Sequence, residues 1–143
     1  MIEGVNVEPL RKIPNDKGDI YHGLKSTDES YVSFGEAYFS NVNHGDIKGW
    51  KKHNEMVLSL IVPVGSIRFV IYDDRFHSST FQQFFEITLG IKNYSRLTIA
   101  PGLWVSFQGM QIGQNLLLNI ASIEHDPSES VNCPLEQINY NWN

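Results

Sequence analysis

The segment that decides the fold is residues 56–74, MVLSLIVPVGSIRFVIYDD, in which two apolar runs flank a turn. Residues 56–62 and 67–72 consist largely of Val, Ile, Leu and aromatic side chains, the residue types enriched in β-strands. Pro63-Val64-Gly65 lies between the runs and Asp73-Asp74 follows the second one; both are turn-forming sequences. The segment therefore predicts two successive strands.

The same pattern of short apolar or alternating runs between turn-formers extends through the chain. Its other members are residues 31–39, 84–89, 96–100, 104–107 and 116–123. No segment places apolar residues at helical spacing over more than about two turns. Short strands at this spacing are typical of an antiparallel sandwich or barrel, so the predicted fold class is all-β.

The composition fits one domain covering residues 1–143 and narrows the choice of partners. The formal charge is −5 and the basic residues are scattered, whereas a nucleic-acid surface needs a basic face. The single cysteine, Cys133, excludes an intrachain disulfide and agrees with a reducing compartment. The N-terminus has no signal-peptide pattern, and no run approaches about 18 apolar residues. We therefore expect a cytoplasmic protein that binds neither nucleic acid nor a membrane.

The two ends of the chain differ in character. Residues 8–30 are polar and turn-rich, which favours an N-terminal segment, residues 1–30, that wraps the surface or is exchanged between the subunits of a dimer. In the C-terminal tail, an extended chain would place Ile138, Tyr140 and Trp142 on one face. We therefore expect the tail to dock on the protein rather than to be disordered.

A basic cluster, DIKGWKKHNEM at residues 46–56, precedes the first run of the deciding segment. Lys51 and His53 lie two residues apart, so on a strand both side chains share a face and can enter one cavity. A cationic amine beside an imidazole is suited to anion binding or to acid–base chemistry. The alternative is a pair of solvated lysines next to an ordinary polar histidine.

A series of short motifs stands in order between residues 36 and 127 and points to a family. The motifs are Lys48-Gly49-Trp50-Lys51, Val64-Gly65, Asp73-Asp74-Arg75, Ser79-Thr80-Phe81, Asn93 with residues 97–102, and His125-Asp126-Pro127. They resemble, in the same order, the Arg-Gly-Leu-His, Gly turn, Asp-x-Arg, Pro-Thr-Phe, Asn-to-Pro-Gly and Tyr-x-Pro motifs of the dTDP-4-dehydrorhamnose 3,5-epimerase family.

The resemblance implies both a fold and an activity. Members of the family are small jelly-roll cupins, usually homodimers, that act on nucleotide-linked keto sugars. It therefore implies a cupin-type antiparallel β-sandwich and an isomerase of the carbohydrate epimerase type. The implied reaction is epimerisation or keto-isomerisation of a 4-keto-6-deoxy sugar in surface polysaccharide biosynthesis, by proton transfer without a metal or other cofactor.

Two family positions that carry the chemistry hold other residues here. The family's proton-abstracting histidine corresponds to Lys51, and the tyrosine that returns a proton corresponds to His125. By resemblance, Lys51 or His53 removes the proton next to the ketone, and His125 returns one. The catalytic candidates are Lys51, His53 and His125, and the substrate-binding candidates are Lys48, Trp50, Arg75, Trp104 and Asn119.

Individual roles follow from the chemistry of these side chains. Lys48 and Arg75 would hold the oxyanion or phosphate charge, and the two tryptophans would stack on a base or sugar. Asn119 shares the inner face of a strand that, if unbroken, would also carry His125 into the cavity.

Each candidate also has a purely structural interpretation. Lys51 can face solvent, His125 can be a turn residue, and a tryptophan in a strand is usually core. Arg75 can pair with the neighbouring aspartates, and Tyr38 is interpreted as core or rim packing. A metal site is not predicted, because there is no His-x-His pair and a site from His44, His53 and His125 would need the fold to bring them together.

The sequence is also compatible with two other functions. One is a catalytically degenerate cupin that binds a sugar nucleotide or glycan without turnover, as the replaced family residues allow. The other is a structural oligomerisation module, in which Trp50 and Trp104 would close the cavity.

Overall fold

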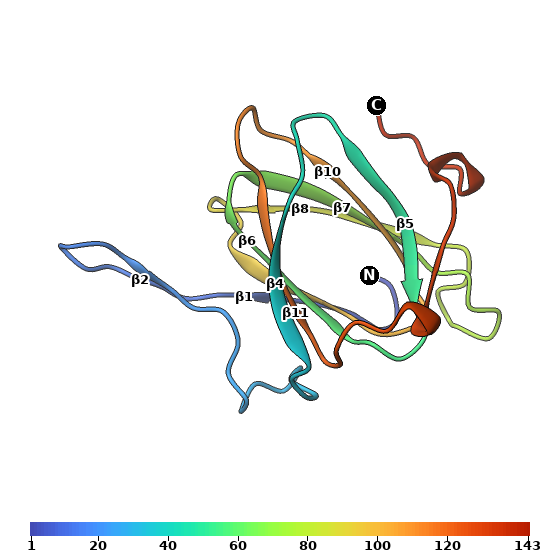
Figure 1. Ribbon diagram of the computed structural model, residues 1–143, viewed down its shortest axis with the longest axis horizontal. Coiled ribbons are helices and arrows are strands. Elements are labelled where there is room, and N and C mark those ends of the chain that lie inside the picture. Colours follow the sequence, from blue (N-terminus) through green and yellow to red (C-terminus); the bar gives the residue numbers. More distant parts are fainter.

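Two antiparallel sheets pack face to face in the computed structural model, which describes residues 1–143 (Figure 1). The first sheet has the order β1 (Val5–Pro9), β9 (Ser95–Ile99), β6 (Leu58–Val64), β11 (Leu116–Ala121) and β4 (Glu36–Asn41). The second has the order β12 (Ser130–Asn132), β5 (Ile47–His53), β10 (Trp104–Gly109), β7 (Ser66–Tyr72) and β8 (Phe84–Gly90). This arrangement confirms the predicted all-β jelly roll.

The remaining elements are short. A hairpin of β2 (Lys12–Ile13) and β3 (Ile20–Tyr21) extends away from the sandwich (Figure 1). The single-turn helices η1 (Pro127–Glu129) and η2 (Leu135–Gln137) lie in the C-terminal segment. Neither helix is long and apolar enough to cross a membrane.

The deciding segment forms β6 and β7, but these strands belong to different sheets and do not pair with each other. The chain passes from one sheet to the other at Gly65, whose φ of +81° favours glycine. A Cβ at Gly65 would lie 2.3 Å from the backbone oxygen of Gln114, so the corner also requires the absence of a side chain. The turn was therefore predicted correctly, while its role as a corner between sheets depends on tertiary packing.

The core lies between the sheets and is built from the inward residues of both. Leu58, Leu60 and Val62 of β6 face Ile67 and Phe69 of β7 in one buried cluster. All five side chains are at most 6% exposed. Alternation along each strand fixes which side chains enter this space.

The C-terminal tail docks on the outer face of the second sheet, as its sequence pattern predicts. The ring centroids of Trp142 and Trp50 are 6.3 Å apart, and those of Tyr140 and Phe84 are 5.1 Å apart. Arg68 lies 5.0 Å from the centre of the Trp142 ring and donates a hydrogen bond to the Trp142 carbonyl. The tail thereby shields the outer side of the strand that carries the basic cluster.

Candidate active site

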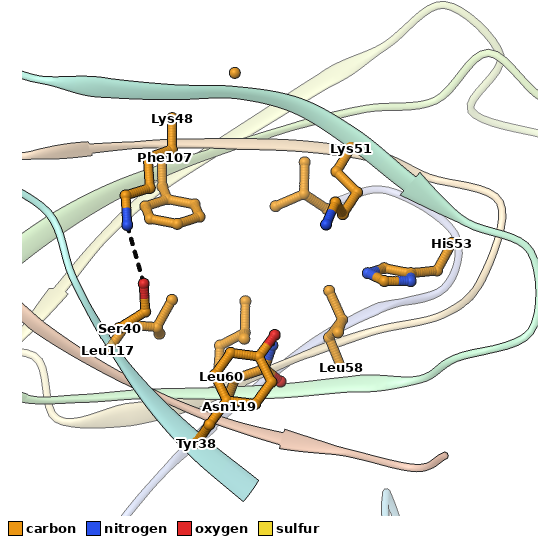
Figure 2. A pocket seen from close by; sticks show the side chains of 12 residues that line it. Tyr38, Ser40, Lys48, Lys51, His53, Leu58, Leu60, Phe107, Leu117 and Asn119 are labelled. Atoms are coloured by element: carbon orange, nitrogen blue, oxygen red, sulfur yellow. Dashed lines mark hydrogen bonds between the residues drawn. The ribbon is translucent and has the colours of Figure 1, made fainter. Parts of the chain in front are cut away.

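A cavity of about 290 Å³ opens between the two sheets (Figure 2). Strands β4, β6 and β11 supply one wall, and β5 and β10 supply the other. Its lining residues are Tyr38, Ser40, Lys48, Gly49, Lys51, His53, Leu58, Leu60, Val105, Phe107, Leu117 and Asn119. The cavity therefore combines an apolar floor with a few polar groups that face one another, as is usual for small-molecule sites.

A β-bulge in β5 directs two lysines into this cavity. Lys48 is paired with Phe107 and Lys51 with Val105, so two residues of β5 stand opposite the single residue Ser106 of β10. Strict alternation would send side chains three apart to opposite faces, whereas the extra residue restores Lys48 and Lys51 to the same face. The hydroxyl of Ser106 fixes the bulge by donating to the Lys48 carbonyl at 2.8 Å.

His53 stands at the end of β5 and pairs with the buried carboxylate of Glu129. Its Nδ1 bonds one oxygen of the Glu129 carboxylate, and the other oxygen accepts from the backbone amides of Glu55 and Met56 at 3.1 and 3.2 Å. Burial alone would raise the pKa of Glu129, but the hydrogen bonds from His53 and the two amides outweigh it and lower that pKa. Glu129 is therefore held as a carboxylate that orients His53 and leaves the other ring nitrogen, Nε2, free.

Tyr38 lies on the wall of the cavity opposite the strand that carries His53 (Figure 2). Asn119 lies beside it on β11 and donates from Nδ2 to the Tyr38 hydroxyl at 2.9 Å. Burial raises the pKa of Tyr38, with the hydrogen bond from Asn119 acting in the other direction. The phenol is consequently protonated at neutral pH and can give a proton to a bound molecule.

The two lysines differ in their partners. The Lys48 ammonium donates to Ser40 Oγ at 3.0 Å and to the Asn41 carbonyl at 2.6 Å. Lys51 has no carboxylate within ion-pair distance and makes no hydrogen bond through its ammonium group. A lysine amine is a cation at neutral pH, so the charge that Lys51 brings to the cavity wall is available to an anionic group of a ligand.

Comparison with known proteins identifies the family of this chain. No protein-family model matches the chain. A crystal structure of a dTDP sugar isomerase from Desulfovibrio desulfuricans G20 is 36% identical, covers 94% of this chain and 87% of its own, and superposes with a TM-score of 0.91. The chain belongs to the dTDP-4-dehydrorhamnose 3,5-epimerase family.

Two further comparisons agree with this family. The dTDP-4-dehydrorhamnose 3,5-epimerase of Sulfolobus tokodaii is 22% identical, with a TM-score of 0.85 over 96% of this chain and 81% of its own, which speaks for the fold. The spore coat polysaccharide biosynthesis protein SpsL of Bacillus subtilis strain 168 is 24% identical over 100% of this chain and 97% of its own. The resemblance found in the motifs is thereby confirmed.

The cavity of this family member contains four of the predicted site residues. Lys48, Lys51, His53 and Asn119 line it together. Tyr38 was missed because it was interpreted as packing. What marks Tyr38 as a site residue is its pairing with Asn119 on the adjacent strand. No local pattern in the sequence reveals this pairing.

Trp50 and Trp104 do not reach the cavity, contrary to the prediction. Both are on the outer face of the second sheet, because Lys51 and Val105, their neighbours in sequence, point inward. Trp50 is fully buried under the C-terminal tail and donates from Nε1 to the Leu135 carbonyl at 3.1 Å. Neither tryptophan closes the cavity. The closed cavity expected of a structural oligomerisation module is therefore not found.

Trp104 instead belongs to an outer polar contact. It donates from Nε1 to Asp74 at 2.8 Å, and the Lys52 ammonium lies 4.8 Å from the centre of its ring. Lys52 also pairs with Asp74 at 3.4 Å. Lys52 thus points away from the cavity that Lys51, its neighbour, enters.

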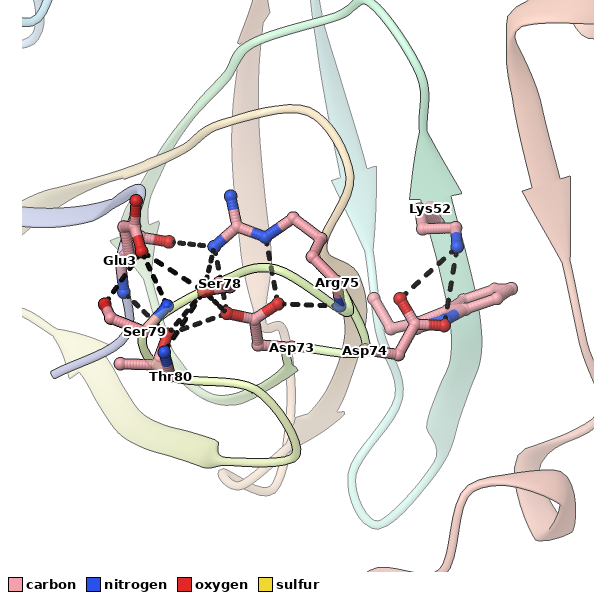
Figure 3. A network of polar contacts seen from close by, with 9 residues as sticks. Glu3, Lys52, Asp73, Asp74, Arg75, Ser78, Ser79 and Thr80 are labelled. Atoms are coloured by element: carbon pink, nitrogen blue, oxygen red, sulfur yellow. Dashed lines mark hydrogen bonds and ion pairs between the residues drawn. The ribbon is translucent and has the colours of Figure 1, made fainter.

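Arg75 is likewise outside the cavity and serves a structural network (Figure 3). Its guanidinium makes a two-pronged contact with the fully buried carboxylate of Asp73, at 2.9 Å from both Nε and Nη2. Ser78 and Thr80 donate to the same carboxylate at 2.6 and 2.7 Å, and Arg75 also donates to the Glu3 carbonyl. Arg75 therefore does not join the cavity residues in which the sequence prediction placed it, and its Nε and Nη2 groups instead hold the N-terminus and the loop after β7 together.

We expect Asp73→Asn to lower the free energy of unfolding at neutral pH. We also expect the stability of this variant to depend less on pH in the acid range. Burial alone would raise the pKa of Asp73, but hydrogen bonds from Arg75, Ser78 and Thr80 outweigh it and lower that pKa well below its usual range. The carboxylate therefore stabilises the fold above the unfolded-state pKa of about 3.9, and this contribution is lost as the pH falls through and below that value.

Urea unfolding at pH 7, 5 and 3 measures the effect. The wild type is expected to lose more stability between pH 5 and pH 3 than Asp73→Asn does. Asp74→Asn is the matched control and should cost less at pH 7, because Asp74 is 35% exposed and Asp73 is not. Equal acid sensitivity of wild type and Asp73→Asn would contradict the assignment.

His125 lies in an exposed turn rather than in the cavity. Strand β11 ends at Ala121, so the alternation that would have carried His125 inward stops before it. Its backbone amide donates to Glu36 at 2.9 Å, which fixes the turn. His44, His53 and His125 also do not come together, and no group of three or more His, Cys, Asp or Glu side chains is placed to hold a metal ion.

Proposed function

We propose that the protein epimerises or isomerises a nucleotide-linked 4-keto-6-deoxy sugar by proton transfer next to the ketone. The observation that carries this proposal is the pair of opposed walls in one cavity, with His53, which Glu129 orients, on one side and Tyr38 on the other. A proton removed at one wall and returned at the other inverts a carbon centre. The relative involved in spore coat polysaccharide biosynthesis supports a role in making a surface polysaccharide.

In the proposed mechanism His53 is the base. Its Nδ1 is held by Glu129, so Nε2 takes the proton next to the ketone and the buried carboxylate stabilises the imidazolium that forms. Lys51, the neighbour that shares this wall, stabilises the oxyanion of the enolate. Tyr38 supplies a proton from the opposite wall, and the same groups act in reverse in the return reaction.

Lys48 is suited to a different part of the substrate. Its ammonium group is anchored by Ser40 and by the Asn41 carbonyl, which hold it at the opposite end of the cavity from His53 (Figure 2). A fixed cation at that place would bind a diphosphate and leave the sugar between Lys51 and Tyr38. The apolar side chain of Phe107 lies under this lysine, with its ring centre 6.0 Å from Nζ.

Hydrogen exchange tests this function directly. Purified protein is incubated in deuterated water with dTDP-4-keto-6-deoxyglucose and its GDP-linked counterpart, and deuterium at the carbons next to the ketone is followed by NMR. Incorporation that requires the protein is the expected result. The proposal is overturned if neither sugar acquires deuterium at catalytic protein concentrations.

The second candidate is a cupin that binds such a sugar without turnover. It is favoured by the replacement of the family's catalytic histidine and tyrosine by Lys51 and His125. Calorimetric titration separates the two candidates, because this one predicts saturable binding of the keto sugar with no deuterium incorporation.

We also propose a cytoplasmic homodimer. The lone Cys133 is a free thiol, which suits a reducing compartment.

Two exposed features favour the dimer. Strand β4 is a free sheet edge, and Phe39 on it is 62% exposed. Ile20 of the extended hairpin is 52% exposed, which suits exchange of residues 1–30 with a second copy. Sedimentation equilibrium at micromolar concentration is expected to give twice the 16.3 kDa chain mass, and a monomer would end this proposal.

A further inference from the structure

Asn119 is a polar residue in an apolar row of β11. On the inner face of this strand it lies between Leu117 and Ala121, and Leu60 is its partner on the adjacent strand. The side chain is only 7% exposed. Its Nδ2 donates to Tyr38, but its Oδ1 is buried and accepts no hydrogen bond from the protein.

An acceptor left in this state is unusual in a folded protein. Almost all buried polar atoms have a hydrogen-bond partner, and an exception needs a specific reason. The other buried side-chain atoms without a partner belong to Arg68, Arg96, Thr98 and Trp142, and none of these residues lines the cavity. Asn119 Oδ1 therefore stands out as the unsatisfied atom on a residue of the candidate active site.

The hydrogen bond between Asn119 and Tyr38 leaves one group of each side chain without a partner. Because Tyr38 Oη accepts from Asn119 Nδ2, the phenolic proton is free to be donated to a molecule in the cavity. Oδ1, the unpaired acceptor, belongs to the same amide as the Nδ2 that holds this hydroxyl. A ligand group that satisfies Oδ1 has to be a donor, which a sugar hydroxyl is and a ketone or a deoxy carbon is not.

We propose that Asn119 selects the sugar: its Oδ1 accepts a hydrogen bond from a ring hydroxyl on or beside the reacting carbon, while its Nδ2 orients Tyr38. This inference rests on the proposed function. It adds the group of the substrate that the site recognises, a ring hydroxyl. A sugar without that hydroxyl leaves the acceptor buried and unpaired in the complex as well. Sites that hydrogen-bond a substrate hydroxyl reject analogues that lack it for this reason.

Asn119→Leu separates this role from a merely structural one. Leucine has a similar volume and suits the apolar row, and the variant removes an unsatisfied buried acceptor. We therefore expect its thermal unfolding temperature to equal or exceed that of the wild type. A residue that served only the fold would give a lower unfolding temperature when replaced.

The test compares dTDP-4-keto-6-deoxyglucose with its 2-deoxy and 3-deoxy analogues by calorimetric Kd and by deuterium exchange. The wild type is expected to prefer the complete sugar over at least one analogue by about 10- to 100-fold. In Asn119→Leu this preference should shrink to within about 3-fold. Tyr38→Phe is the matched control: it keeps Oδ1, so it should lose exchange and retain the preference in Kd.

The outcomes distinguish the two proposals. Unchanged preference in Asn119→Leu, or no preference in the wild type, overturns the role of Asn119 while exchange of the complete sugar still supports the proposed function. If no keto sugar binds or exchanges, both the proposed function and the role of Asn119 are rejected.

Discussion

His53→Ala is expected to lower the rate of deuterium exchange and of epimerisation by roughly 10²–10⁴-fold, the usual contribution of a positioned general base. His53 is the histidine of the cavity, and its Nδ1 is held by the buried carboxylate of Glu129. Removing the imidazole should leave the protein folded, because Glu129 keeps the two backbone amides of Glu55 and Met56 as donors. The measurement is kcat by NMR, with circular dichroism to verify the fold.

His125→Ala is the matched control for this variant. The family motif assigns His125 a catalytic position, but its side chain is exposed in a turn beyond the end of β11. We expect the control to retain activity within about 2-fold, as surface changes usually do. A loss in His125→Ala as large as that in His53→Ala would mean that the site is not the cavity described here.

The strands of this protein were predictable because its sequence carries their physical pattern locally. Residues 56–62 and 67–72 became β6 and β7, since a run of β-branched and aromatic side chains between turn residues has few other stable arrangements. The run 31–39 shows the limit of such patterns. Its strand begins only at Glu36, because the preceding residues lack a neighbouring strand with which to pair.

The direction of side chains was less predictable than the strands. Simple alternation put Lys51 and His53 on one face correctly and also places Trp50 on the other face, but it does not contain the bulge that brings Lys48 into the cavity. That bulge depends on β10, which lies more than 50 residues later in the chain. The sequence around Trp50 holds no sign of it.

The partners of the catalytic candidates were the hardest part to foresee. Glu129 binds His53 across 76 residues of sequence, and Asn119 binds Tyr38 across 81. Neither pair forms a motif, and each exists only because strands from distant parts of the chain become neighbours. Tyr38 with its amide partner and the carboxylate that orients His53 therefore emerge from the fold, while the basic cluster was visible in the sequence.

Lys51→Met is expected to lower kcat by about 10²–10³-fold, the effect of removing one donor that stabilises an oxyanion. Methionine keeps the length and apolar stem of lysine and removes only the charge. Lys52→Met is the control next to it in sequence, with its side chain paired with Asp74 on the outer face. We expect that control to stay within about 2-fold of wild type. Steady-state rates on the same keto sugar measure both.

Lys51→Arg then decides between the two roles that the lysine could have. Arginine keeps a permanent positive charge and cannot act as a base. If Lys51 stabilises the enolate while His53 takes the proton, the arginine variant should keep activity within about 10-fold of wild type, far above the methionine variant. If arginine is as inactive as methionine, Lys51 itself removes the proton and His53 only positions the substrate. The structure favours the first outcome, because Glu129 orients His53 while no side chain orients or deprotonates Lys51.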